Sequence, residues 1–263
     1  MKRTTICLFA AAVALGAWGC SSLTNIDSSR ALQAGVTAAS AAAITDADIV
    51  EMCRQAMVVN DSGNQIAPAT SPYAQRLAKL TGGLANYDGL TLNFKVYITD
   101  DVNAFASGDG SVRVYSGLMD VMDDNELMAI VGHEIGHVKN HDTRDAVKNA
   151  YLSAAAREVI GAVGGTVGML SDSMLGDIAL SLTSAKYSRT QETAADEYGF
   201  QFTVKNNFDP YAMANSMKKL QEISGSTGST LGLMQAFSSH PDTAAREKKM
   251  REKADAYVRS QGK

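Results

Sequence analysis

The chain has 263 residues, of which 45% are hydrophobic, and its formal net charge is −4. This length is enough for one domain with a substantial core, since domains usually comprise about 100–200 residues. The acidic balance and the lack of a basic block exclude a typical nucleic-acid-binding protein, because affinity for nucleic acid depends on lysine and arginine contacts to phosphate.

The first residues have the pattern of an export signal. Lys2 and Arg3 supply positive charge, residues 6–17 form an apolar run, and Gly19 precedes Cys20 where a signal would be cut. The run is too short to cross a bilayer, which takes about 20 apolar residues. We therefore predict a signal peptide at residues 1–19, whose removal would change the formal net charge from −4 to −6.

Cys20 stands where the lipidated cysteine of a bacterial lipobox would be. Ser21 and Ser22 follow it without an aspartate, which by resemblance to bacterial sorting rules favours the outer membrane. Trp18 and Ala17 are unusual in a lipobox. The prediction is a periplasmic lipoprotein anchored to the outer membrane through Cys20. A plain secretory signal, giving a soluble periplasmic or secreted protein, is the alternative.

The mature chain would keep a single unmodified cysteine. Cys7 would leave with the signal and Cys20 would be acylated, so no intrachain disulfide is expected. Cys53 lies in an apolar helical stretch and is interpreted as a buried small hydrophobe. Residues 20–44, which are rich in small side chains, are predicted to be a tether, and residues 45–263 a single domain.

The first half of this domain predicts two helices and a small sheet. Residues 45–59 begin with a capping-box pattern, and Ser71-Pro72 opens a second helix. Residues 90–98 alternate like a half-buried strand, and residues 103–106 and 112–115 flank a glycine turn that is typical of a hairpin.

The next predicted helix carries the most informative motif, His133-Glu134-Ile135-Gly136-His137. Histidines four residues apart lie on one helix face and can bind the same metal ion. Glu134 lies between them, where it can act as the general base of a zinc peptidase. Asp123, Asp124 or Asn125 can cap the helix. The alternative interpretation is an amphipathic helix with two structural histidines.

A catalytic zinc site needs a third protein ligand. His141 lies one turn beyond His137 and should point past the metal, whereas His240 and several glutamates are further candidates. Glu192 fits best, because Glu192 and Asp196 lie on one face of a second predicted helix. Asp196 could then accept a hydrogen bond from a ligand imidazole. An exposed acidic helix face is the alternative.

Two further segments are predicted to be helical. Residues 146–185 are mostly small and apolar, and we interpret them as a helical lid or wall over the cleft. The charged segment that opens at Pro241-Asp242 predicts a C-terminal helix to about Arg259.

Three motifs together resemble the peptidase family of the heat-shock protease HtpX and the CAAX prenyl proteases, over roughly residues 45–250. They are Gly132 to His137, Ser188-Arg189-x-x-Glu192-x-x-Ala195-Asp196, and His240-Pro241 with Arg246. The resemblance implies an α+β, mainly helical, compact zincin fold of the minigluzincin type, with a small β-sheet or hairpin beside the active-site helix. It also implies one Zn²⁺ held by His133, His137 and Glu192, with Glu134 as catalytic base.

The remaining site assignments combine this resemblance with the sequence patterns described above. His240 is expected near the cleft as a donor to the developing oxyanion, with a purely structural hydrogen bond as the alternative. Asp196 and Arg189 are expected behind the metal ligands. The hairpin that starts at Asn103, Ala104 and Phe105 is expected to hold substrate as an added strand.

The predicted function is a zinc-dependent metalloendopeptidase that cleaves unfolded or misfolded envelope proteins. Its place in envelope quality control is implied by resemblance to periplasmic lipoprotein members of the family. One alternative is a zinc-binding envelope lipoprotein that captures unfolded proteins without cutting them. Another is an interaction module with a vestigial site, which would bind no metal.

Overall fold

The computed structural model describes residues 44–157, 170–226, 240–241 and 243–262. The predicted signal peptide, Cys20 and nearly all of the predicted tether lie outside these residues. Within the described part of the chain, no helix combines the length and the hydropathy that a membrane span needs.

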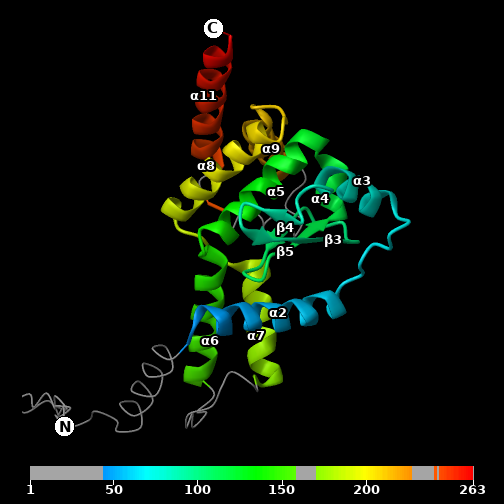
Figure 1. Ribbon diagram of the computed structural model, residues 1–263, viewed down its shortest axis with the longest axis vertical. Coiled ribbons are helices and arrows are strands. Elements are labelled where there is room, and N and C mark those ends of the chain that lie inside the picture. Colours follow the sequence, from blue (N-terminus) through cyan, green and yellow to red (C-terminus); the bar gives the residue numbers. More distant parts are fainter. Residues whose placement is uncertain (1–43, 158–169, 227–239, 242, 263) are drawn as a thin grey trace, which may run out of the picture.

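Helices make up most of the described structure (Figure 1). They are α2 Asp46–Gly63, α3 Pro72–Thr81, α4 Ser116–Val121, α5 Asp124–Lys139, α6 Asp142–Arg157, α7 Asp172–Ser184, α8 Arg189–Lys205, α9 Ala212–Ser226 and α11 Thr243–Gln261. The strands are β1 Asn86–Tyr87, β2 Leu90–Thr91, β3 Asn93–Tyr97, β4 Ala104–Ala106 and β5 Ser111–Tyr115. The expected α+β, mainly helical fold is confirmed.

The larger sheet has the strand order β3-β5-β4. β4 and β5 form the predicted antiparallel hairpin, whereas the parallel pairing of β3 with β5 was not predicted. The expected strand over residues 90–98 is divided, because the backbone N–H of Leu92 donates to Ala85 O and not to the sheet. The hairpin turn requires Gly110, since its φ is +86° and a Cβ there would lie 1.9 Å from Thr91 O.

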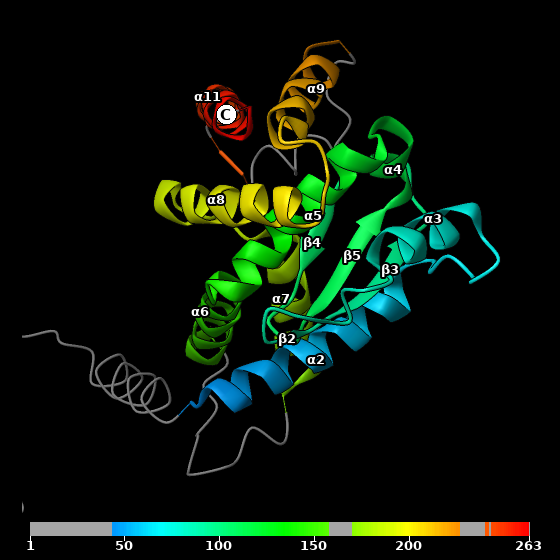
Figure 2. The ribbon, with the colours of Figure 1, turned by 45° about the horizontal axis from the view of Figure 1, so that its top comes forward.

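The sheet lies between two hydrophobic clusters because successive side chains point to opposite faces. Val96, Val112 and Val114 face the buried side of α5. Tyr97 and Phe105 face the opposite cluster, which α2, α6 and α7 complete. Figure 2 shows α2 crossing the sheet on the side away from α5. This arrangement fixes α5 against the sheet, with β4 beside it.

Local sequence signals set the ends of the important helices. Capping boxes begin α2 at Thr45, α5 at Asp123 and α8 at Ser188. Asp123 is one of the three residues predicted to cap the motif helix. Cys53 is buried in α2, and burial raises the pKa of its thiol to about 11, which agrees with its interpretation as a small hydrophobe.

Candidate metal centre and active-site cleft

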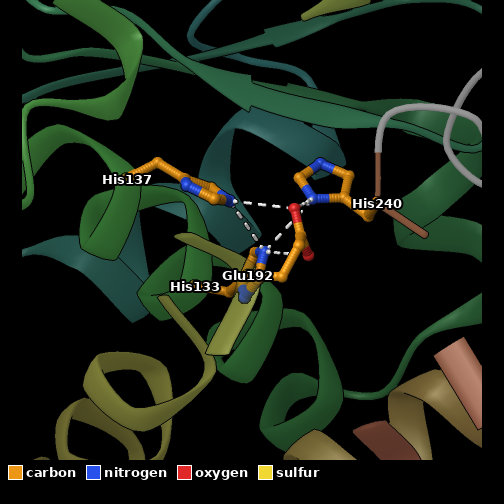
Figure 3. Close-up of side chains that lie close together, drawn as sticks. All are labelled: His133, His137, Glu192 and His240. Carbon is orange, nitrogen blue, oxygen red and sulfur yellow. Dashed lines mark hydrogen bonds and ion pairs between the residues drawn. The ribbon is translucent and has the colours of Figure 1, made fainter. Parts of the chain in front are cut away.

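Four side chains converge at one point beneath the sheet edge (Figure 3). Donor atoms of His133, His137, Glu192 and His240 all lie within 4.8 Å of one another. The Nε2 atoms of His133 and His137 are 3.1 Å apart, and Glu192 Oε1 lies 3.6 Å from His137 Nε2. Glu192 Oε2 lies 3.7 Å from His133 Nε2. The predicted trio is therefore together, and His141, which is exposed, is not part of it.

His133, His137 and Glu192 come together because α5 and α8 cross closely. Glycines occupy the positions of closest contact, where a larger side chain would not fit. A Cβ on Gly136 would lie 3.1 Å from the Cα of Ala195. A Cβ on Gly199 would lie 3.0 Å from the backbone nitrogen of His133 and 2.5 Å from Met213 Cε. The small residues let the two helix backbones approach, which brings Glu192 to the imidazoles.

A buried carboxylate lies behind each of the two imidazoles of the motif. His133 Nδ1 lies 3.0 Å from Asp196 Oδ1, the partner predicted from helix spacing. His137 Nδ1 lies 2.9 Å from Asp142 Oδ2, a partner that was not predicted. The ring of Tyr187 stacks on His137 with 3.8 Å between centroids. Protons on both Nδ1 atoms would leave both Nε2 atoms with lone pairs aimed at the same point.

A buried arginine connects Glu192 to Asp196. Arg246, from α11, donates to both oxygens of Asp196 at 2.6 and 2.8 Å and forms an ion pair with Glu192. Arg189, which was expected behind the ligands, is exposed at the first position of α8. The cation that contacts these two carboxylates thus comes from the C-terminal helix.

The charge balance of the site fits a divalent cation. Four carboxylates are at least 95% buried around the imidazoles, and the buried guanidinium of Arg246 contacts two of them. With neutral imidazoles these five groups carry a formal charge of −3. Buried charges are costly unless they are paired, so the donor set suits Zn²⁺, which prefers imidazole and carboxylate ligands. The four carboxylates belong to Glu134, Asp142, Glu192 and Asp196.

Without a cation the same charges act on the histidines. Burial alone would lower the pKa of His137, but hydrogen bonds to Asp142 and Glu192 outweigh burial and raise the pKa to about 9. Burial lowers the pKa of His133, which favours its neutral form. The surroundings thus favour positive charge on His137 and the neutral form of His133, the form in which an imidazole can bind a metal ion.

Glu134 and His240 face the cleft beside the trio. His240 Nδ1 lies 2.9 Å from Glu192 Oε1 and 3.3 Å from His133 Nε2, while its Nε2 lies 3.6 Å from Glu134 Oε1. Its side chain is 19% exposed, against 1% for Glu192. His240 is therefore close enough to act as a metal ligand, and open enough to meet a substrate.

Two cavities meet at Glu134 and His240, and Asn103 and Ala104 line both. Phe105 lines one of them, together with Leu182 and Thr183 from the end of α7 and with Tyr187. The end of α7 therefore forms one wall of the cleft, in agreement with the predicted wall. Residues 158–169 of that predicted segment lie outside the described residues.

Two residues that contact His137 carried no clear sequence signal. Asp142 reaches His137 across the short break between α5 and α6, where His141 has a φ of +67°, which is rare for a residue other than glycine. Tyr187 precedes α8 in an extended stretch, where no periodicity marks it. Both depend on the path of the chain between helices, which helical spacing does not predict.

Comparisons with known proteins agree with this arrangement. A model of Peptidase family M48 matches residues 70–254. Metalloprotease YcaL of Escherichia coli strain K12 is 40% identical over 254 residues, covering 96% of this chain and 98% of the relative. Metalloprotease LoiP of the same strain is 37% identical over 250 residues, covering 95% and 96%. A protease HtpX homolog from a Sulfurihydrogenibium species is 30% identical over 142 residues, covering 46% and 47%. The resemblance predicted from the motifs is confirmed.

Proposed function

The chain belongs to peptidase family M48, and on this basis and the geometry of the site we propose that it is a zinc-dependent metalloendopeptidase. The observation that carries the proposal is the convergence of two imidazoles and one carboxylate from separate helices, with Glu134 beside them in an open cleft. We propose His133, His137 and Glu192 as the zinc ligands.

In the proposed reaction, zinc activates the water and the carbonyl, and Glu134 transfers the proton. A bound zinc ion would polarise the scissile carbonyl and lower the pKa of an attacking water. Glu134 accepts the proton of that water and passes it to the leaving amine, as a general base and then a general acid. Its location between the two histidines on α5 fixes the carboxylate at the cleft wall, where it is 4% exposed.

His240 donates a hydrogen bond to the developing oxyanion. Support for this role comes from its partial exposure and from the approach of its Nε2 to Glu134. A competing role is that of a fourth metal ligand, since its Nδ1 lies near His133 Nε2. Four protein ligands would complete a tetrahedral site and leave no position for water, as in structural zinc sites.

β4 provides the main-chain template for an extended substrate. Asn103 O accepts from Tyr115 N, and Ser107 N donates to Ser111 O, so these residues direct their backbone groups toward β5. Because antiparallel pairing alternates, Ala104 directs its groups to the outer edge. There its N–H donates to Asn103 Oδ1 at 2.9 Å, a bond that a substrate carbonyl can replace.

We further propose that the protein acts on unfolded or misfolded proteins of the bacterial envelope. The export-like pattern of residues 1–19 supports a periplasmic location, and Cys20 supports a lipid anchor in the outer membrane. Recognition through the main chain suits unfolded substrates, which are extended and varied in sequence. Residues 45–263 would form one catalytic domain.

Metal analysis combined with a casein-cleavage assay tests this function. We expect one zinc per chain and cleavage that stops with a chelator and returns with zinc. Glu134→Gln should keep the zinc and reduce turnover by at least about 10²-fold, since a general base contributes about 10²- to 10⁴-fold. Normal turnover in this variant would reject Glu134 as the base.

The same assay separates the alternatives. A zinc-binding holding protein would contain zinc and bind unfolded casein without cutting it. A vestigial site would contain no metal. The buried Glu134 beside the ligands favours the enzyme, because a binding site for zinc alone has no need of a base in the cleft.

A further inference from the structure

Tyr187 lies in the cleft beside the catalytic groups, and the proposed reaction gives it no role. It directly precedes Ser188, the N-cap of α8. A residue at this position often packs near the fourth residue of the helix, which here is Glu192. The capping box of α8 thus brings an aromatic side chain to the metal centre.

Two kinds of contact place the ring of Tyr187. It stacks on the imidazole of His137, with 3.8 Å between centroids and 15° between planes. It also lines the smaller of the two cavities of the cleft, together with Glu134 and His240. The ring therefore borders both a proposed zinc ligand and the space in which the proposed base acts.

The hydroxyl of Tyr187 is the part of this side chain that packing does not explain. Phenylalanine would stack on His137 equally well, and a buried phenol normally has a hydrogen-bond partner. Among the described residues, none forms a hydrogen bond with this hydroxyl. Because the side chain is only partly buried and lines the cavity, the hydroxyl can meet a polar group of a substrate.

We propose that Tyr187 is a second catalytic hydrogen-bond donor, whose hydroxyl binds the oxygen of the scissile carbonyl and the oxyanion that develops from it. This inference rests on the proposed peptidase function and adds a catalytic residue to it. A phenol has an ordinary pKa of about 10 and keeps its proton at neutral pH. Tyr187 therefore donates a hydrogen bond throughout the reaction and transfers no proton.

The scissile carbonyl is the substrate group that the hydroxyl would meet. The two cavities join at Glu134 and His240, so the bond that is cut has to lie at this junction. Ala104 lines both cavities, and a substrate extended along β4 would cross from one to the other. Tyr187 borders the junction from the smaller cavity.

Tyr187 and His240 are close enough to share one acceptor. Their ring centroids are 5.6 Å apart, with 37° between planes. The hydroxyl extends beyond the edge of its ring, so an oxygen atom between the two side chains can accept from both. Stacking on His137 holds the phenol in place before the reaction. Donors that are fixed in advance stabilise a developing oxyanion most strongly.

Tyr187→Phe tests this role because it keeps the ring and removes only the hydroxyl. Removing one oxyanion donor lowers kcat by about 10²- to 10³-fold, and we expect a loss of this size. The substrate would be an internally quenched peptide copied from a casein cleavage site. KM and zinc affinity should stay at wild-type values, since the stacked ring remains.

Tyr73→Phe is the matched control. The hydroxyl of Tyr73 donates to Asp120 at 2.8 Å, and Tyr73 lines neither cavity of the cleft. This variant should keep the wild-type kcat. An unchanged kcat in Tyr187→Phe, or a loss explained by weaker zinc binding, would overturn the catalytic role and leave the proposed function intact.

A second measurement separates catalysis from a structural effect. A capped alanine peptide with a phosphinate in place of one amide presents a charged tetrahedral group that resembles the oxyanion. Because such analogues depend on interactions made in the transition state, Tyr187→Phe should bind this peptide at least about tenfold more weakly than wild type. A structural role would leave its dissociation constant unchanged once zinc is bound.

If zinc-loaded wild type cuts no peptide, the proposed function fails, and Tyr187 is then judged from binding alone. Isothermal titration calorimetry would compare the phosphinic peptide with wild type, Tyr187→Phe and Tyr73→Phe. Weaker binding to Tyr187→Phe alone would support the hydroxyl as an oxyanion donor. Equal dissociation constants in the three proteins, or no binding to wild type, would overturn it.

Discussion

Asp142, which lies outside the motif, holds the imidazole of His137, one of the proposed metal ligands. Its carboxylate is 5% exposed and lies 2.9 Å from His137 Nδ1, which sets the ring so that Nε2 faces the other donors. Because such carboxylates fix the tautomer and raise the basicity of the ligand, removing one usually costs about 10- to 100-fold in metal affinity.

We therefore expect Asp142→Ala to weaken zinc binding by about 10- to 100-fold, measured by competition with a chromogenic chelator. Asp142→Asn, which keeps an acceptor oxygen, should lose less. The control is Asp145→Ala, an exposed carboxylate on the same helix, which should bind zinc normally. Equal affinities for all three variants would contradict this role of Asp142.

The two roles considered for His240, oxyanion donor and fourth metal ligand, predict opposite changes in kcat when the residue is replaced. As an oxyanion donor it would contribute about 10²- to 10³-fold to kcat. His240→Ala should therefore lower kcat by about that factor and leave the zinc content at one per chain, measured on a peptide substrate with parallel metal analysis. A rise in kcat would instead identify His240 as a fourth ligand that closes the site.

At the scale of elements, the α5–α8 crossing controls the site through its glycines. Adding a methyl group at Gly199 would push α8 away from His133 and Met213. Overpacking typically costs about 1–3 kcal/mol. We expect Gly199→Ala to lower the free energy of unfolding by that amount and to weaken zinc binding, because Glu192 moves with α8.

Gly176→Ala is the matched control for this prediction. Gly176 is exposed on α7, and nothing lies within 4 Å of an added Cβ. Since alanine is the better helix former, this variant should gain about 0.5–1 kcal/mol of stability, measured by urea unfolding. If Gly199→Ala were as stable as Gly176→Ala, the close crossing would not constrain the site.

An ion pair between Asp61 and Arg113 joins α2 to the sheet. Arg113 of β5 is 2% exposed and donates to both oxygens of Asp61 in α2 at 2.8 and 3.0 Å. Burial alone would raise the pKa of Asp61, but hydrogen bonds from Arg113 and Lys95 outweigh burial and lower the pKa to about 2. The ionised carboxylate therefore stabilises the fold.

Because the pKa of Asp61 is lower in the folded chain than the ordinary value of 3.8, its contribution is complete above about pH 4 and is lost as the pH falls toward 2. The shift corresponds to about 2 kcal/mol. We expect the difference in unfolding free energy between wild type and Asp61→Asn to shrink as the pH falls from about 4 toward 2 in urea titrations. A difference that is constant with pH would contradict this assignment.

At the scale of the whole molecule, the features that could be predicted from the sequence are those set by residues close together in the chain. The helix start at Thr45 follows a capping pattern, Asp123 is one of the three residues expected to cap α5, and the hairpin follows its glycine turn. His133, His137, Glu192 and Asp196 were found because helical spacing puts each pair on one face. The structure brings all four together: the first three offer donor atoms within 4.8 Å of one another, and Asp196 Oδ1 lies 3.0 Å from His133 Nδ1.

Other features depend on long-range packing and could not be read from local patterns. The parallel pairing of β3 with β5 needs a connection whose path the sequence does not specify. Asp142 depends on the turn at His141, and the contact of Arg246 with Glu192 joins α11 to α8. Arg246 entered the sequence analysis only through family resemblance, because the spacing of 54 positions carries no structural meaning by itself.

The metal should also hold the whole domain together, because its proposed ligands come from two helices that pack in the core. A ligand that binds only the folded state stabilises it by about 4 kcal/mol when its concentration is 1,000 times its dissociation constant. For a domain of this size, each kcal/mol raises the Tm by about 2–4 °C. Saturating zinc should therefore raise the Tm by about 8–16 °C over chelator-treated protein, measured by calorimetry.

Two variants test whether this rise depends on the proposed ligands. Glu134→Gln, which keeps all three proposed ligands, should show the full rise. His137→Ala should show little, because it lacks one imidazole and leaves Asp142 without its partner. Equal midpoints with and without zinc in wild type would mean that the buried carboxylates are balanced without a metal.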